Sequence, residues 1–558
     1  MEKAEDSPPP PYTRLDEPDE VAKDPLWRRY VNSFRRMEVA AAEADPSDDP
    51  EKPMKIVDKT DMGLKRSLTN RHIQMIAFGG AIGTGLFIGS GAVLSSSGPA
   101  SVLIGFALIG TMLFNVVMAL GEMAVLYPIA GSFNVYCTRF IDPAWGFAIG
   151  WNYAIQWLVT LPLELTAATI TINYWHNNVD PHIWITIVLL LVVFINCFGV
   201  KGYGEAEFLF SMVKIIAVIA FIIVGVVIDV GGGPKGEYLG TKTWQDPGPF
   251  NNGFKGFCAV FVTAAFAFGG AEMVGLAAAE SAEPRKTLPK ATKQVFWRIT
   301  LFYLVTLLLI GFIVPYTDPR LLGASATANV TASPFVIAID NAGIKILPSI
   351  FNGVILVSVL SVGNSAVYGA SRTLCALAQQ GQAPQILGYI DREGRPLVSI
   401  IISLLFGGIA YINGLASSDA HPSIGSSPSP ASPPSSLGAP SAGLTSVFAG
   451  PGRRKATPST NYHSKRPLGG PPSADTFFQA YLAFPITILS YVVWKVYKKT
   501  PFMVTHGGSA TGTSLLDTET MDLDTGRRDL DLATILVEER AAYAALPAWI
   551  KFYRSFCG

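Results

Sequence analysis

The stretch GGAIGTGLFIGSG, residues 79–91, lies in the middle of the first long apolar run of the chain. Six of its thirteen residues are glycine, which forms helices poorly and exposes backbone. In a bilayer, backbone leaves helical geometry only where it is buried in protein or lines a cavity. A Gly-Thr-Gly break at mid-membrane depth therefore predicts a substrate site made of free N–H groups and carbonyls, which favours a transporter over an enzyme.

Composition favours a membrane protein. Of 558 residues, 49% are hydrophobic and only 15% are charged, whereas soluble proteins average about 25% charged. The formal net charge is zero, so composition implies no bulk affinity for nucleic acid. The five cysteines form no CxxC pair, and four of them lie in or beside apolar runs. We therefore expect no metal site, no disulfide and no cofactor.

The chain divides into a polar tail, a membrane core and a second polar tail. Residues 1–68 are polar and acidic, so we expect a disordered tail without a cleavable signal peptide. Ten later runs are apolar and about 20 residues long, enough to span a bilayer. These runs are 72–94, 102–125, 145–170, 183–200, 207–230, 257–279, 296–316, 348–370, 396–413 and 476–495. The predicted fold is therefore all-α, with helices one to nine within a core at 69–413.

Lysine and arginine set the expected orientation, because they gather in cytoplasmic loops. With the N-terminus inside, the inner loops and the flank after the last span hold most of these residues. They are Arg139, Lys201, Arg285, Lys286, Lys290, Lys293, Arg392, Arg395, Lys495, Lys498 and Lys499. Both termini are therefore predicted to be cytoplasmic. Asn329 begins an Asn-Val-Thr sequon in a predicted outer loop and is a candidate glycosylation site.

Two segments outside the predicted core have unusual composition. Residues 414–475 are rich in Ser, Pro, Ala and Gly and cannot form a core, and they separate the last span, 476–496, from the other nine. The tail 497–558 is acidic and ends in aromatic and apolar residues alternating with basic ones. This end could form an interfacial helix with Cys557 as a lipidation candidate, or it could be a frayed polar tail.

A second glycine break lies in FAFGGAEMVGLAAAES, residues 266–281, within the sixth span. Gly269 and Gly270 stand at mid-depth there, and Glu272 follows them. Interrupted helices in spans one and six indicate a five-plus-five inverted repeat. The N–H groups at the N-terminal end of a helix favour an anion, and the carbonyls at its C-terminal end favour a cation. A zwitterionic α-amino acid carries both charges and therefore fits such a site. The alternative is that these glycines only let helices pack closely.

Charged residues within spans mark pathways, proton relays or internal pairs, because a charge at the bilayer centre is costly. Glu122, Glu164 and Glu272 are the acids, with structural pairing as the alternative to function. Lys214 in the fifth span could titrate near physiological pH and make transport proton-coupled. Alternatively, Lys214 snorkels to the inner interface.

Aromatic side chains near the breaks are candidates to cap a substrate. They are Phe266, Phe268, Trp151, Tyr153 and Trp157. Most aromatic residues in membrane spans face lipid or pack the interior. Phe266 is the strongest candidate, because it directly precedes the second break.

The chain resembles the fungal amino acid permease family of the amino acid–polyamine–organocation superfamily, which has the LeuT-like fold. The resemblance rests on several stretches and covers nearly all of the chain except 1–60 and 414–470. They are LKRSLTNRHIQMIAFGGAIGTGLFIGSG, ALGEMAVLYPIAGSF, FAFGGAEMVGLAAAESAEPRKTLPKA, SVGNSAVYGASRTLCALAQQGQAP and MDLDTGRRDLDL. It implies plasma-membrane uptake of amino acids driven by the proton gradient, and tails that ubiquitin-ligase machinery could recognise.

The resemblance also implies roles for individual residues. Backbone N–H groups of Gly83, Thr84 and Gly85 would bind the substrate carboxylate. Carbonyls around Gly79, Gly80, Ile82 and Phe266 would receive the ammonium, and Phe266 would also be the outer gate. We predict that Phe268, Gly269 and Gly270 at the second break also bind substrate. Lys214 would replace the sodium ion of related symporters, and Glu272 would share in proton coupling. Cys557 would match a palmitoylation site.

The sequence departs from this family in one respect. The family has twelve helices, and residues 414–475 stand where helices ten and eleven are expected, with only SAGLTSVF, 441–448, resembling part of helix ten. The segment is either a gene-model or frameshift artefact or a genuine variant with an extracellular linker. Sequencing the transcript across these codons distinguishes the two.

Three functions compete at this stage. The first is proton-coupled amino acid import, and the second is a nutrient receptor that binds amino acids but transports them poorly. The third is transport of another cationic amine, which the Gly-Thr-Gly carboxylate site disfavours. An enzyme is not expected, because the sequence presents no nucleophile–base set and no metal-spaced cluster.

Overall fold

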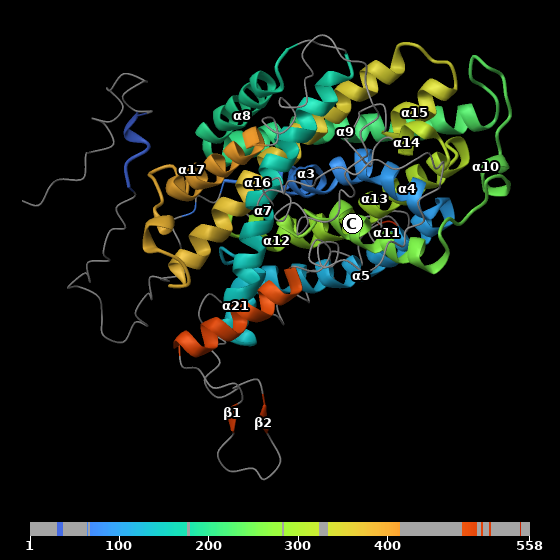
Figure 1. The fold of residues 1–558 in the computed structure, drawn as a ribbon. Coiled ribbons are helices and arrows are strands. Elements are labelled where there is room, and N and C mark those ends of the chain that lie inside the picture. The colour runs from blue at the N-terminus through green and yellow to red at the C-terminus, as the bar shows by residue number, and fades with distance from the viewer. Residues whose placement is uncertain are drawn as a thin grey trace, which may run out of the picture.

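The protein forms a helical bundle, which we describe from a computed structural model (Figure 1). The described residues are 31–36, 64, 67–175, 179–281, 284–322, 333–412, 483–498, 504–505, 513–514 and 547. The expectations for 414–475, Asn329 and Cys557 therefore lie outside the described residues. Two short strands, β1 (Val504–Thr505) and β2 (Thr513–Ser514), pair antiparallel in the C-terminal tail.

Five helical stretches are long and apolar enough to cross a membrane. The first combines α3 (Asn70–Ala81), η1 (Gly85–Gly89) and α4 (Ser90–Ser97). The others are α5 (Pro99–Leu126), α7 (Pro143–Asn173), α9 (Gly199–Asp229) and α16 (Leu347–Gln379). Each overlaps one of the predicted spans, so hydropathy located these elements correctly.

Shorter helices complete the bundle and its loops. Those overlapping the remaining predicted spans are α8 (Pro181–Cys197), α11 (Gly253–Ala267), α12 (Met273–Ala277), α13 (Pro284–Ile313), α17 (Leu397–Phe406) and α21 (Ala483–Lys498). Single helical turns extend α12 as η2 (Ala278–Glu280) and α17 as η6 (Gly407–Ile409). The connecting helices are α6 (Phe133–Phe140), α10 (Lys242–Gln245), α14 (Pro319–Leu322), α15 (Pro334–Asn341) and η5 (Gln385–Gly388).

The first helical stretch, Asn70–Ser97, contains the first glycine break and lies in the interior of the bundle. α3 lies against α9, α13, α16 and α12, while α7 packs along α16 and α5 along α13. Figure 1 shows α3 and α12 in the middle, with α5, α8 and α21 on the outside. The most apolar window of Asn70–Ser97 is 83% buried, against 28% for that of Pro99–Leu126. A glycine-rich segment can occupy the centre because its missing side chains let neighbouring helices approach closely.

The outer helices present apolar residues to the surroundings. On α5, Ile104, Leu108, Met112 and Val116 are all exposed, and their spacing of four residues places them on one helix face. Such a continuous apolar face is unfavourable in water and is expected against lipid. This face therefore supports a membrane-spanning bundle independently of helix length.

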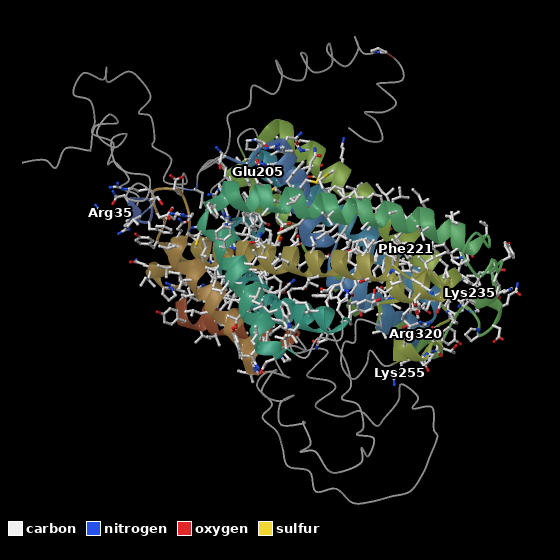
Figure 2. All side chains as sticks on the ribbon, turned by 90° about the horizontal axis from the view of Figure 1, so that it is seen from above. Arg35, Glu205, Phe221, Lys235, Lys255 and Arg320 are labelled. Atoms are coloured by element: carbon white, nitrogen blue, oxygen red, sulfur yellow. The ribbon has the colours of Figure 1, made fainter. Side chains whose placement is uncertain are left out.

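Loops far apart in the sequence meet at the two ends of the bundle. At one end, the Arg392 N–H donates to the Arg35 carbonyl at 2.9 Å, and the Leu68 N–H donates to the Glu280 carbonyl at 2.9 Å. Figure 2 shows Arg35 near this end and Lys235, Lys255 and Arg320 at the opposite one.

At the opposite end, the Asn251 N–H donates to the Ser97 carbonyl at 2.9 Å. The Trp175 indole donates to the Ser349 hydroxyl at 2.7 Å. The described part of the chain is therefore arranged as a multi-pass bundle with two distinct ends.

Candidate functional site

The first helix break separates α3 from η1. α3 ends at Ala81, Ile82 is extended with φ −80° and ψ 99°, and helical geometry resumes at Thr84. The following turn, Gly85–Gly89, is a π-helix, a geometry often found at functional sites. A helix that ends inside a protein leaves carbonyls without intrahelical partners. In this protein, side chains from other helices bond to carbonyls at the end of α3.

Two of these side chains come from α9 and α16. The Lys214 ammonium donates to the Gly79 carbonyl at 2.7 Å, and the Ser358 hydroxyl donates to the Ile82 carbonyl at 3.0 Å. Lys214 is fully buried, so it does not snorkel to an interface. The ammonium therefore lies at the carbonyl end of the broken helix, where the helix dipole favours a cation.

The second break separates α11 from α12. α11 ends at Ala267, and Gly270 follows with φ +100°, a left-handed conformation that favours glycine. The Gly270 N–H donates to Glu272 Oε2 at 2.9 Å, and the Tyr153 hydroxyl donates to Glu272 Oε1 at 3.1 Å. Glu272 thus caps the break within its own segment, and α7 supplies the second donor.

The two breaks touch each other through glycine. A Cβ added to Gly270 would lie 2.5 Å from the Gly80 carbonyl carbon and oxygen. A Cβ added to Gly85 would lie 2.5 Å from the Ala267 Cα. Real Cβ atoms do not approach other atoms this closely, so the sequence needs glycine at both positions. The structure therefore brings the two breaks together, although they are nearly 190 residues apart. The sequence predicted these breaks at equivalent points of spans one and six.

One tyrosine joins the two broken helices. Tyr303 of α13 is fully buried, and its hydroxyl lies 2.7 Å from the Ala81 carbonyl oxygen and 2.7 Å from the Ala267 carbonyl oxygen. These are the last residues of α3 and α11. Tyr303 thus lies within hydrogen-bonding distance of both free helix ends and shares its single hydroxyl proton between them.

A carboxylate faces the first break from α7. The Thr84 hydroxyl donates to Glu164 Oε1 at 2.7 Å, and Glu164 is 1% exposed. Within the described residues, the other oxygen, Oε2, has no protein partner. Buried polar atoms normally have hydrogen-bond partners, so this oxygen has the capacity to bind a further donor. The opposite charges of Lys214 and Glu164 therefore flank the first break.

The predicted aromatic residues occupy different surroundings. Phe266 is half-buried in the last turn of α11. Phe268 is 1% exposed, and its ring stacks on Tyr303 with centroids 4.7 Å apart. Phe268 therefore contributes to an aromatic layer inside the bundle, next to the tyrosine that joins the breaks.

Other predicted residues lie at or away from the breaks. Gly83 faces α16, because a Cβ there would lie 2.4 Å from Val362 Cγ2. Gly269 is half-buried between α11 and α12. Glu122 is exposed on α5, so the structure does not bring it to the breaks.

Sequence reasoning missed several residues that contact the breaks or bond to Lys214 beside the first break. They are Tyr303, Ser358, Ser361 and Glu207. A signal for two of them exists in SVLSVGNSAVYGAS, residues 358–371, where small polar residues recur every three or four positions on one helix face. Within the described residues, no group of three or more His, Cys, Asp or Glu could hold a metal ion.

Comparisons with known proteins show which family the chain belongs to. The amino acid permease family model matches residues 72–424. The chain is 46% identical to the general amino-acid permease GAP2 of Candida albicans, covering 97% of this chain and 95% of the relative. It is also 46% identical to the general amino-acid permease GAP1 of Saccharomyces cerevisiae, covering 97% of this chain and 93% of the relative. The chain belongs to the amino acid permease family.

This permease is therefore a multi-pass membrane transporter and not an enzyme. The solved structure of MhsT in complex with L-phenylalanine matches it at a TM-score of 0.46 and 16% identity, covering 63% of this chain and 81% of that one. The family match ends at residue 424, within the Ser/Pro-rich segment. The alignment with the Candida relative runs over 586 positions, more than the 558 residues of this permease, so the relative has residues that this one lacks.

Proposed function

We propose that this permease is a secondary active transporter that imports amino acids across the plasma membrane by proton symport with alternating access. The observation that carries the proposal is the contact between Lys214 and the Gly79 carbonyl at the first break. This contact places a buried, titratable cation beside the segment predicted to bind substrate. Proton binding and amino acid binding would therefore act on the same broken helix.

We assign recognition of the substrate to the backbone of the two breaks. N–H groups of Gly83, Thr84 and Gly85 would bind the carboxylate, because helix N-termini favour anions. The ammonium would bind among the carbonyls around Gly79, Gly80, Ile82 and Phe266. Three of them already accept one hydrogen bond, Gly79 from Lys214, Ile82 from Ser358 and Phe266 from the Gly269 N–H, and a carbonyl can accept a second. Backbone recognition of the groups common to all α-amino acids is consistent with relatives that are named general amino-acid permeases.

We assign proton coupling to Lys214, with Glu272 as a second group that holds a proton. When Lys214 is protonated, its ammonium fixes the Gly79 carbonyl and draws α9 onto α3. When it is neutral, this charge-assisted hydrogen bond is weakened and α3 is freer to move. Glu272 would act in the opposite sense at the second break, because protonation weakens the hydrogen bond that its carboxylate accepts from the Gly270 N–H.

The proposed arrangement is a five-plus-five inverted repeat with both termini cytoplasmic. Residues 69–413 would form the core, 476–496 the last span, and 1–68 and 497–558 the cytoplasmic tails. Support comes from Lys495 near the end of α21, whose ammonium pairs with Asp142 at the start of α7 at 2.5 Å. Both residues belong to segments predicted on the inner side. Glycosylation at Asn329, lipidation at Cys557 and recognition of the tails by ubiquitin-ligase machinery stay predictions.

The test is uptake of a radiolabelled mixture of the twenty L-amino acids by yeast that lack their own permeases. Cells with this permease should accumulate label at acidic external pH and lose accumulation when a protonophore is added. Binding without accumulation would instead identify a receptor. No accumulation of labelled amino acids, together with accumulation of labelled choline or a labelled polyamine, would identify an amine transporter.

A further inference from the structure

A second buried carboxylate, Glu207, has no role in the function proposed above. It is 0% exposed and lies on α9 two helical turns before Lys214, about 10 Å along the helix axis. Burying a carboxylate among apolar helices is costly unless it is paired and hydrogen-bonded. The hydrogen-bond partners of Glu207 therefore indicate its role in the protein.

A continuous line of hydrogen bonds joins Lys214 to Glu207. The Lys214 ammonium donates to Ser361 Oγ at 2.8 Å, and the Ser361 hydroxyl donates to Glu207 Oε2 at 2.7 Å. The Asn364 amide donates to the other carboxylate oxygen at 3.5 Å. All four side chains are 0% exposed. The line thus runs from a cation to an anion through one hydroxyl that can both accept and donate a proton.

The backbone of α3 covers the Glu207 carboxylate. A Cβ added to Gly79 would lie 2.0 Å from Glu207 Oε2 and 2.9 Å from Ser211 Oγ. Only glycine leaves space for the carboxylate here, and the carbonyl of the same Gly79 accepts from Lys214. Movement of α3 away from α9 would therefore break the Lys214 contact and uncover Glu207 together.

We propose that Ser361 relays the coupled proton from Lys214 to Glu207, and that Glu207 releases it to the cytoplasm when α3 moves. This proposal rests on the proton symport proposed above and describes how the proton is released on the cytoplasmic side. An Nζ–H bond of Lys214 breaks as that proton reaches Ser361 Oγ, while the hydroxyl proton of Ser361 passes to Glu207 Oε2. The ammonium–carboxylate pair becomes a neutral amine and a neutral carboxyl, so no charge is created in the bundle.

The other titratable groups near Glu207 are bonded to partners of their own. On α9 itself, the Tyr203 hydroxyl lies 3.1 Å from Ser365 Oγ. From α16, the Arg372 guanidinium makes two hydrogen bonds to Glu280, at 2.9 and 3.0 Å. From α7, Glu164 accepts from Thr84. On α3, His72 pairs with Glu205 at 3.0 Å.

The direction of the relay follows from position along α9. Glu207 is eight residues from the first residue of α9 and Lys214 is fifteen. With the N-terminus inside, α9 starts at the cytoplasmic end, so the acceptor lies nearer the cytoplasm than the donor. A proton taken up by Lys214 from the outside would therefore move inward along the line.

The test compares exchange with accumulation in proteoliposomes that contain the full chain. Exchange of labelled for unlabelled L-amino acids at equal pH needs substrate binding and alternating access but no net proton release. Accumulation driven by an acidic exterior needs proton release. Ser361→Ala and Glu207→Gln should each retain exchange and lose the accumulation driven by the pH gradient, and Ser361→Thr, which keeps a hydroxyl, should recover it.

Matched controls separate the relay from a structural role. Ser403→Ala removes a buried hydroxyl that donates to the Ser399 carbonyl at 2.8 Å, and Glu205→Gln removes an exposed acid on the same helix as Glu207. Both should keep exchange and accumulation. Unchanged accumulation in Glu207→Gln, or loss of exchange equal to the loss of accumulation, would overturn the relay. Absence of pH-driven accumulation in the unsubstituted protein would instead refute the proposed proton symport itself.

Discussion

The two helix breaks of this permease are stabilised in different ways. At the first, carbonyls at the end of α3 accept hydrogen bonds from Lys214, Ser358 and Tyr303, each on a different helix. At the second, the Gly270 N–H is capped by Glu272 two residues later. The first break therefore depends on the positions of α9, α13 and α16, whereas the second has a cap of its own in addition to bonds from Tyr153 of α7 and Tyr303 of α13.

This difference suggests that the two breaks respond differently when neighbouring helices move. A segment capped locally keeps its shape when neighbouring helices move. A segment whose carbonyls bond to three other helices changes its hydrogen bonds whenever one of those helices shifts. We therefore expect the second break, with its local cap, to be the more fixed part of the site and the first break to respond more strongly to proton binding.

Gly270→Ala should have the largest effect, because it attacks the fixed part. Alanine at φ +100° costs about 1–3 kcal/mol, and its Cβ would also collide with the Gly80 backbone. We expect loss of the monodisperse folded protein in detergent, measured by fluorescence-detected size-exclusion chromatography.

Gly80→Ala is the matched control for this change. Its Cβ would meet Met273 Sδ at 3.2 Å and the Gly270 Cα at 3.3 Å, distances that small shifts can relieve. It should lower stability less than Gly270→Ala. Equal stability of the two variants would contradict the rigid contact between the breaks.

Gly83→Val should abolish amino acid uptake while leaving the protein at the cell surface. The Cβ would lie 2.4 Å from Val362 Cγ2 and crowd the N–H groups predicted to bind the carboxylate. Radiolabelled uptake and surface biotinylation measure the two quantities separately.

A double substitution sharpens this prediction. Gly83→Ala alone should also lower uptake, and Gly83→Ala with Val362→Ala should recover part of it, because the colliding methyl group is removed. Normal uptake by Gly83→Val would refute the carboxylate site at the first break.

Much of this arrangement could be predicted from sequence, because hydropathy and glycine spacing are local signals. The spans and both breaks follow from runs of apolar residues and from Gly83, Gly269 and Gly270. The partners of the breaks could not be predicted. Lys214 and Gly79 are 135 residues apart, and the face that α9 turns toward α3 is decided by packing of the whole bundle.

Glu207 illustrates the same limit. In the sequence, Glu207 follows the stretch Gly-Tyr-Gly-Glu-Ala at the start of a predicted span. An acid at that position is expected near the lipid headgroups. The structure instead buries it beneath Gly79, because a glycine on α3 leaves the space that the carboxylate fills. Only the three-dimensional contact between the two helices reveals this pairing.

Tyr303→Phe should have the smallest effect of the three substitutions at the breaks. It removes one hydroxyl and leaves the Ala81 and Ala267 carbonyls without that donor, which costs about 1–3 kcal/mol. Thermal unfolding in detergent should shift downward, and uptake should fall only severalfold. Tyr316→Phe, whose hydroxyl donates to the Pro247 carbonyl at 3.1 Å away from the breaks, should shift unfolding less. A larger shift for Tyr316→Phe would contradict the bridging role of Tyr303.

The most direct measurement is the pH dependence of uptake by Lys214→Met, with Lys201→Met, an exposed lysine on the same helix, as the control. Without the ammonium at Gly79, we predict that uptake becomes independent of external pH and no longer concentrates amino acids, while Lys201→Met keeps the profile of the unsubstituted permease. An unchanged pH profile and undiminished accumulation in Lys214→Met would contradict proton coupling through the first break.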